Sequence, residues 1–150
     1  MKEREELVTK IEEKLAGKAV SSRRDIPNRM YVYIEGEDLP EAVRLLFDEL
    51  SGRYVILTGV DTPVGVEVLY HFSFDRVGLV VTLRVLLDKD KPEIDSITPI
   101  VRGAEWIERE IHELLGVEFV GHPNMRRLIL AEDWPKGVYP LRRSYGKNTT

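Results

Sequence analysis

The chain contains no cysteine. Disulfides, thiolate metal sites, iron–sulfur ligation and a cysteine nucleophile are therefore excluded within these 150 residues, and any redox centre would have to belong to a partner. Long apolar runs are also missing. No window approaches the roughly 20 apolar residues that cross a bilayer, and the charged N-terminal sequence MKEREELVTKIEEKLAG lacks the apolar core of a secretion signal. We therefore expect a soluble, cytoplasmic chain. With only three methionines and 32% charged residues, the composition is also compatible with a heat-adapted source.

The net charge of −4 is unevenly distributed along the chain. Residues 121–150 carry six Lys and Arg against two Asp and Glu, whereas residues 1–100 carry 14 against 19. The basic C-terminal end favours contact with an acidic protein surface. A nucleic-acid partner is disfavoured, because the sequence pI of about 5.5 is far from the basic values of such domains and no aromatic–basic RNA motif is present.

Hydrophobic periodicity predicts two helices and one strand in the first third of the chain. Apolar residues at helical spacing form a first amphipathic helix that ends at Gly17. Residues 30–35 are rich in β-branched and aromatic types and predict a strand. Residues 39–50 present one apolar face, with Pro40 at an early helical position and Gly52 after the end, so they predict a second helix.

Three strand-like runs follow, RYVILTGVD, VGVEVLYHFSFD and VGLVVTLRVLLD, separated by turn residues. In the middle run Val66, Val68, Tyr70 and Phe72 alternate with more polar residues, which predicts one apolar sheet face. The fold class that we expect is α+β: two helices packed on a largely antiparallel sheet of about four strands, over residues 1–94. Residues 95–150 should add one helix and an extended C-terminal wrapping segment to the same structural unit, with no independent second domain.

The third helix is predicted by the sequence AEWIEREIHELLG. Ile107, Ile111, Leu114 and Leu115 form an apolar stripe, and Gly116 is the expected C-terminal stop.

The opposite face of this helix carries Glu105, Glu108, Arg109 and His112. A zinc-protease helix would need a second histidine four residues after His112, where Gly116 stands. A carboxylate-bridged di-metal site would need a glutamate three residues before His112, where Arg109 stands. We therefore expect a solvated or partner-facing surface on which Glu108 pairs with His112.

After this helix, the sequence VEFVGHPNMRRLILAEDWPKGVYPLRRSYG combines three prolines with two Arg-Arg pairs and fits no regular element. Ordering each residue costs roughly 1–2 kcal/mol, so its apolar side chains need a cover, which docking on another protein would supply. An alternative from another class is a stand-alone anion-binding or hydrolytic domain that uses the Gly-His-Pro-Arg-Arg loop. The loop has neither a Walker-type glycine-lysine arrangement nor a nucleophile–base pair.

The region from WIEREIHELLG to YPLRRSY resembles the 30-kDa subunit family of respiratory complex I, whose members are the C-type subunits of NADH dehydrogenase. The family motif runs approximately E-R-E-x-x-D-x-x-G-I-x-F-x-G-H-P-x-L-R-R-I-L, followed by G-x-P-L-R-K. The resemblance covers residues 95–145 closely. Positions in register are Glu108, Arg109, Glu110, Gly116, Phe119, Gly121, His122, Pro123, Arg126, Arg127, Leu130, Pro140, Leu141, Arg142 and Arg143.

The chain departs from the family pattern at three places. The aspartate of the motif is either shifted by one residue or replaced by Glu113, and Arg143 stands where lysine is common. The chain also ends within ten residues of the P-L-R-R motif, without the longer tail of typical members. In this it looks most like the short members of archaeal membrane-bound nickel–iron hydrogenase and sulfur-reducing complexes.

The resemblance implies a non-catalytic hydrophilic subunit of a membrane-bound electron-transfer complex that is coupled to ion translocation. This subunit would hold no cofactor or metal; iron–sulfur clusters and a nickel–iron centre would belong to its partners. It would lie peripherally on the cytoplasmic side of the membrane and position a hydrogenase-like large subunit, of the D type, beside an iron–sulfur small subunit, of the B type. In the alternative reading, the chain is the C-type subunit of an NADH- or deazaflavin-dependent quinone oxidoreductase.

The same resemblance implies that the region from the third helix to the P-L-R-R segment contacts the large subunit. The expected partner-interface residues are Glu108, Arg109, Glu110, Phe119, Gly121, His122, Pro123, Arg126, Arg127, Pro140, Leu141, Arg142 and Arg143. For His122 we hypothesise a structural role: it organises a turn by bonding backbone or a nearby carboxylate, because no base, nucleophile or second metal ligand lies near it in sequence.

Overall fold

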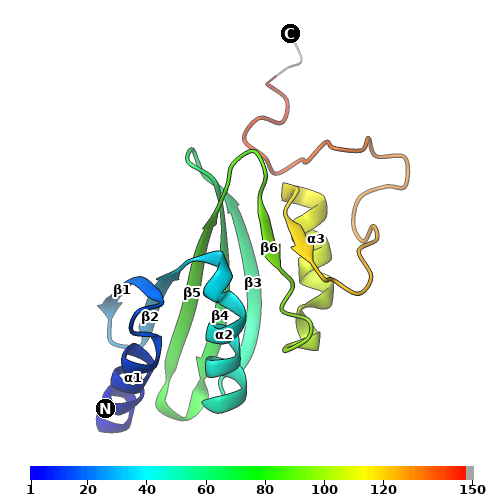
Figure 1. Ribbon diagram of the computed structural model, residues 1–150. Coiled ribbons are helices and arrows are strands. Elements are labelled where there is room, and N and C mark those ends of the chain that lie inside the picture. Colours follow the sequence, from blue (N-terminus) through cyan, green and yellow to red (C-terminus); the bar gives the residue numbers. More distant parts are fainter. Residues whose placement is uncertain (148–150) are drawn as a thin grey trace.

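The computed structural model describes residues 1–147 and shows helices packed against one face of a twisted sheet (Figure 1). Short 3-10 turns at Gly36–Asp38, Asp75–Val77 and Arg102–Ala104 connect some of the elements. Within the described residues the helices and strands follow in this order: α1 (Lys2–Leu15), β1 (Ala19–Ile26), β2 (Arg29–Ile34), α2 (Leu39–Arg44, continued by a π-helical turn at Leu45–Glu49), β3 (Arg53–Asp61), β4 (Val66–Phe74), β5 (Leu79–Leu87), β6 (Glu93–Asp95), α3 (Glu105–Leu115) and β7 (Glu118–Val120).

The main sheet has the strand order β1-β2-β5-β4-β3. Strands β3, β4 and β5 form the antiparallel meander that the turn residues predicted, and β2 pairs with β5 in parallel. The second helix, predicted at residues 39–50, is confirmed as α2 with its π-helical continuation. The α+β class and the largely antiparallel sheet are thus confirmed, but the sheet has five strands where four were expected.

The strand that the sequence analysis missed is β1, at the edge of the sheet. Its sequence AVSSRRDI has no apolar alternation, and six of its eight residues are exposed. Its pairing with β2 also shifts register twice, between Ala19 and Ser21 and between Arg23 and Ile26. Charges and bulges of this kind blunt an edge strand against further pairing, and they also remove the periodicity by which a strand is recognised.

The buried face of the sheet is the one that the alternation in β4 predicted. Val66, Val68, Tyr70 and Phe72 are all 0% exposed and belong to a hydrophobic cluster that includes residues of α1, α2 and α3. Gly59 on β3 lets α3 approach closely, because a Cβ there would lie 2.5 Å from Leu115 Cδ1. The third helix is therefore fixed directly against the sheet.

The chain leaves α3 through Gly116, which has a positive φ of 77° and ends the helix as predicted. Strand β7 then pairs in parallel with β6, a contact that the sequence analysis did not anticipate because each strand has only three residues. Residues 121–147, which we call the wrapping segment, contain no helix or strand, extend beyond α3 and return toward the end of β3 (Figure 1).

Candidate docking surface

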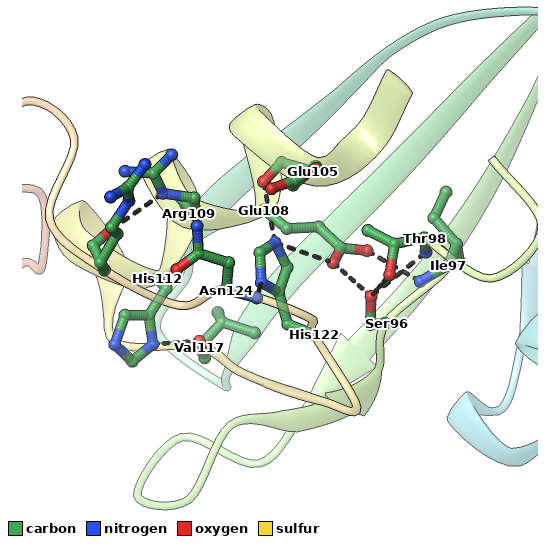
Figure 2. A network of polar contacts seen from close by, with 11 residues as sticks. Ser96, Ile97, Thr98, Glu105, Glu108, Arg109, His112, Val117, His122 and Asn124 are labelled. Atoms are coloured by element: carbon green, nitrogen blue, oxygen red, sulfur yellow. Dashed lines mark hydrogen bonds and ion pairs between the residues drawn. The ribbon is translucent and has the colours of Figure 1, made fainter. Parts of the chain in front are cut away.

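The polar face of α3 is largely covered by the chain itself, whereas a solvated or partner-facing surface was expected. Glu108, Arg109 and Glu113 are 0%, 5% and 7% exposed, because the wrapping segment and residues 96–98 cover them. The predicted pair of Glu108 with His112 is wrong. His112 Nδ1 instead donates to the carbonyl of Val117 at 2.8 Å (Figure 2). The helix therefore binds its own chain on this face.

Arg109 and Glu113, four residues apart on one side of α3, bind five consecutive residues of the wrapping segment. Arg109 Nε and Nη2 donate to the carbonyls of residues 126 and 127 at 2.9 and 2.7 Å. The Glu113 carboxylate accepts from the backbone amides of residues 128, 129 and 130 at 2.8, 2.8 and 3.4 Å. We call residues 126–130 the clamped segment. It runs alongside α3, and these two side chains satisfy five of its backbone groups without a sheet.

Glu113 lies three residues after Glu110, which is the position of the aspartate in the family motif. Glu113 therefore replaces this aspartate, and the acidic position is not shifted along the sequence. Burial raises the pKa of Glu113, but the three amide donors outweigh burial, and this pKa therefore lies below its usual range. A carboxylate that stays ionised accepts stronger hydrogen bonds than a neutral side chain would. Glu113 is thus suited to holding a segment that has no regular structure.

His122 joins the turn at residues 121–124, which we call the docking turn, to the start of α3. Its Nε2 donates to the carbonyl of Glu105 at 2.9 Å, and the Asn124 amide donates to its Nδ1 at 3.0 Å (Figure 2). Gly121 supplies the positive φ of 82° that the turn requires. The histidine bonds backbone, as its hypothesised structural role requires.

Glu108 points to the other side of α3 and is buried against residues 96–98. Its carboxylate accepts from Ser96 Oγ at 2.6 Å and from the Ile97 amide at 2.8 Å, and Ser96 Oγ lies 2.7 Å from Thr98 Oγ1 (Figure 2). Burial raises the pKa of Glu108 to about 7, against the lowering effect of these donors. Burial therefore disfavours the charged form of this carboxyl group despite its two hydrogen-bond donors.

The P-L-R-R end of the wrapping segment is fixed to the molecule by its own contacts. The Leu141 amide donates to the Leu114 carbonyl at 3.0 Å, which satisfies a free carbonyl of the last turn of α3. Arg142 Nη2 donates to the Lys89 carbonyl at 2.6 Å, and the Arg143 amide donates to Asp61 Oδ2 at 2.7 Å. The wrapping segment is thus bonded to the start of α3 through His122 and to the end of α3 through Leu141.

Each of the two Arg-Arg pairs divides into one internal and one outward arginine. Arg127 donates to the carbonyls of Ala131 and Trp134, and Arg142 to that of Lys89. The guanidinium groups of Arg126 and Arg143 are exposed and have no hydrogen-bond or ion-pair partner within residues 1–147. The sequence contains no signal that distinguishes the internal arginine of each pair from the outward one.

The expected interface residues thus occupy different places. Phe119, Glu108 and Arg109 lie inside the chain, whereas Glu110 and Pro140 are half-buried and Gly121 and Pro123 are exposed. Leu141, which was expected at the interface, is 58% exposed. Three further large apolar residues on α3 and in the wrapping segment are also exposed but were not expected there, since an isolated apolar residue is common on any surface: Trp106, Ile129 and Tyr145, each between 50% and 65% exposed.

Substitution of Gly116 by alanine is expected to lower the free energy of unfolding by about 2 kcal/mol. The positive φ costs any side chain about 1 kcal/mol, and the new Cβ would lie 2.6 Å from the Tyr139 ring, which must move together with the wrapping segment. Urea unfolding measures the change. The matched control is Gly137→Ala, with a φ of 76° and nothing within 4 Å. Equal effects of the two substitutions would show that the contact with Tyr139 contributes nothing.

In the part of the chain that the structure describes, no cluster of three or more His, Asp or Glu side chains could hold a metal ion. Nor is any helix among residues 1–147 both long and apolar enough to cross a membrane. The alternative of an anion site in the Gly-His-Pro-Arg-Arg loop is disfavoured, because two of the side chains that would bind the anion are already bonded to backbone. These are both ring nitrogens of His122 and the guanidinium group of Arg127.

The chain is similar to subunits of several multi-subunit enzymes. It is 37% identical over 120 residues to formate hydrogenlyase subunit 5 of Escherichia coli, covering 77% of this chain and 21% of the relative. It is 42% identical over 95 residues to the C/D subunit of the NADH-quinone oxidoreductase of Phocaeicola vulgatus, covering 61% of this chain and 18% of the relative. The chain thus spans about a fifth of the length of each of these relatives.

A solved structure supports the same relationship. The fold matches a chain of the membrane-bound sulfane sulfur reductase, an archaeal respiratory membrane complex, with a TM-score of 0.82 and 26% identity. The match covers 93% of this chain and 84% of the other. Residues 32–150 also match the model of the family described as the respiratory-chain NADH dehydrogenase 30-kDa subunit. Because this match spans most of the sequence, the chain belongs to the family of the 30-kDa subunit of the respiratory-chain NADH dehydrogenase.

Proposed function

We propose that the chain is a hydrophilic assembly subunit of a complex I-related, membrane-bound electron-transfer complex, and that it docks on and positions a hydrogenase-like large subunit. It would lie on the cytoplasmic side of the membrane, with the large subunit and an iron–sulfur small subunit as neighbours. Iron–sulfur clusters, and a nickel–iron centre where the parent complex is a hydrogenase, would belong to these neighbours.

The observation that carries this proposal is the outward side of the wrapping segment and α3. These two elements expose the free guanidinium groups of Arg126 and Arg143 and the apolar side chains of Trp106, Ile129 and Leu141. Arginine binds carboxylates in a flat bidentate geometry, and Trp and Arg are enriched at the centres of protein interfaces. Since internal contacts already order the wrapping segment, little conformational entropy would be lost on docking.

The relatives support a large partner protein. In the relative from Phocaeicola vulgatus, whose name carries the two letters C/D, the region similar to this chain makes up only 18% of the length. In that protein, a region of this kind shares one polypeptide with a much longer one. Covalent joining is compatible with a close contact between the two, and we propose that the same contact forms here between separate chains.

The parent complex is proposed to be an energy-converting hydrogenase or a related ferredoxin-linked oxidoreductase. Two observations support it: the similarity to a formate hydrogenlyase component and the TM-score of 0.82 with a chain of the sulfane sulfur reductase. A quinone oxidoreductase is supported by the relative with the highest of the quoted identities, 42% over 95 residues. Both alternatives use the same docking surface.

The test is co-purification of the tagged chain with its large subunit from cells that express the whole complex. The double substitution Arg126→Gln and Arg143→Gln is expected to lower the recovered large subunit at least tenfold, because truncating interfacial charges typically costs several kcal/mol. The melting temperature of the isolated chain should stay the same, since neither guanidinium has a partner within residues 1–147.

The matched control is the double substitution Arg29→Gln and Arg44→Gln, which removes two exposed arginines on β2 and α2. Recovery of the large subunit should be unaffected in this variant. Normal recovery with the Arg126 and Arg143 substitutions, or equal loss in both double variants, would count against the proposed surface. Binding of inorganic phosphate by the isolated chain would favour the anion-site alternative.

A further inference from the structure

Glu108 and His122 form a fully buried pair between α3, residues 96–98 and the docking turn. Their side chains are 0% and 1% exposed, and Glu108 Oε2 lies 4.0 Å from His122 Nε2 (Figure 2). No lysine or arginine in residues 1–147 lies within 4.0 Å of the Glu108 carboxylate. A negative charge on Glu108 is therefore balanced only by neutral hydrogen-bond donors.

His122 cannot neutralise a negative charge on Glu108 without losing one of its hydrogen bonds. Its Nδ1 accepts from the Asn124 amide, so this nitrogen must keep its lone pair, and the ring proton lies on Nε2, which donates to the Glu105 carbonyl. A second proton on the ring would have to replace the bond from Asn124. The closed docking turn therefore requires a neutral imidazole, and an ionised Glu108 would be buried beside it.

The other groups around Glu108 are neutral donors. The hydroxyl of Ser96, in the segment after β6, donates to Glu108, and the hydroxyl of Thr98 bonds that of Ser96. The phenols of Tyr54 on β3 and Tyr70 on β4 lie close enough for the charge of Glu108 to raise their pKa values further, after the larger effect of burial.

Three charged groups lie further out. Asp95 on β6 also raises the pKa of Tyr70, although less than burial and Glu108 do. Arg102 and Glu105 line a surface pocket of about 410 Å³ beside the docking turn, together with Pro123. None of these charged side chains is within hydrogen-bond distance of the Glu108 carboxylate, so solvent is the remaining source of stabilisation for its charged form.

We propose that Glu108 and His122 form a proton-dependent lock on the docking turn, in which the closed turn keeps a proton on Glu108 and opening of the turn releases that proton to solvent. The proposal relies on the proposed function only where it calls this turn a docking element. Opening moves the imidazole away from Glu108 and admits water, so that the carboxylate ionises at its ordinary pKa, and reclosing takes up one proton. Acidification thus tightens the docking turn, and neutral pH loosens it.

The pH window follows from the two states of Glu108. Its pKa is about 7 in the closed turn and about 4.5 when solvated. Between these values opening releases a proton, so the opening constant rises up to tenfold per pH unit; below about 4.5 and above about 7 it is flat. With these two pKa values, a chain at pH 7 would open its docking turn about 80 times more often than at pH 4.5.

Amide hydrogen exchange of the full-length isolated chain, followed by NMR between pH 4 and 8 and corrected for intrinsic exchange, tests the lock. The Asn124 amide, which bonds His122, reports opening of the docking turn, and the Tyr70 amide in β4 reports global unfolding. We expect Asn124 to open more often than Tyr70 and to show the rise between pH 4.5 and 7. In Glu108→Gln the Asn124 opening constant should be independent of pH, whereas the matched control Glu110→Gln should behave as wild type.

A pH-dependent opening at Tyr70 without one at Asn124 would overturn the lock, because Glu108 would then stay buried when the turn opens. A pH-independent opening constant at both amides would overturn it as well. If Glu108→Gln fails to fold, the carbon-13 shift of the Glu108 carboxyl in the wild-type chain decides: titration near 7 supports the lock, and titration near 4.5 overturns it. All of these readouts use the chain without a partner, so a failure of the proposed docking function would leave them unchanged.

Discussion

Replacement of Glu113 by glutamine is expected to free residues 128–130 from α3 and to raise the exchange rates of their backbone amides by about a hundredfold. The carboxylate accepts from three consecutive amides, and an amide side chain would present an NH₂ group to donors that need an acceptor. Charge-assisted hydrogen bonds contribute about 1.5–3 kcal/mol each and are not additive, so we expect a loss of about 3 kcal/mol in the local opening free energy. Amide exchange at Leu128 and Ile129 measures it.

The control for this substitution is Glu110→Gln, the same chemical change on the same helix. Glu110 is half-buried, and its side chain makes no hydrogen bond or ion pair with any of residues 1–147. The substitution should leave exchange in the clamped segment as in wild type. Unchanged exchange at Leu128 and Ile129 in Glu113→Gln would mean that packing, and not the Glu113 carboxylate, holds the segment.

Regular elements could be predicted from the sequence wherever burial imposes a period on it. The alternation of Val66, Val68, Tyr70 and Phe72 identified the buried face of β4 because every second residue of this strand is buried. Strand β1 lies at the exposed edge, where no face is buried along its length, and it therefore left no pattern. The two short strands β6 and β7 are held by pairing between residues distant in sequence, which local periodicity does not reveal.

The candidate site could be predicted in outline but not in its contacts. Spacing on α3 placed Glu108 and Arg109 on the polar face, and a polar face is normally solvated. This rule failed because Arg109 and Glu113 satisfy backbone groups of the wrapping segment that have no partner in a helix or sheet, and these contacts with main chain bury both side chains. The resemblance to a family located the region, whereas the division of each arginine pair depends on where single carbonyls lie.

The second large effect concerns the dependence of global stability on pH. Glu108 has a folded pKa of about 7, above its ordinary value of 4.5, so the folded chain binds more protons than the unfolded chain between these values. Stability from this group is therefore fully present below about pH 4.5 and is lost as pH rises to about 7, by about 3 kcal/mol. Glu113 acts in the opposite sense: its pKa is lowered, so its stabilising contribution is present above its ordinary pKa and is lost as pH falls through the lowered value.

Urea unfolding of wild type and Glu108→Gln at pH 4.5, 6 and 7.5 separates these opposing effects. The stability difference between the two proteins should change by about 3 kcal/mol across this range, with the variant gaining relative to wild type as pH rises. Contributions from other carboxylates, such as Glu113, are common to both proteins and cancel in the difference. A constant difference would mean that Glu108 is ionised at its ordinary pKa in the folded chain, and that Ser96 and Ile97 compensate fully for its burial.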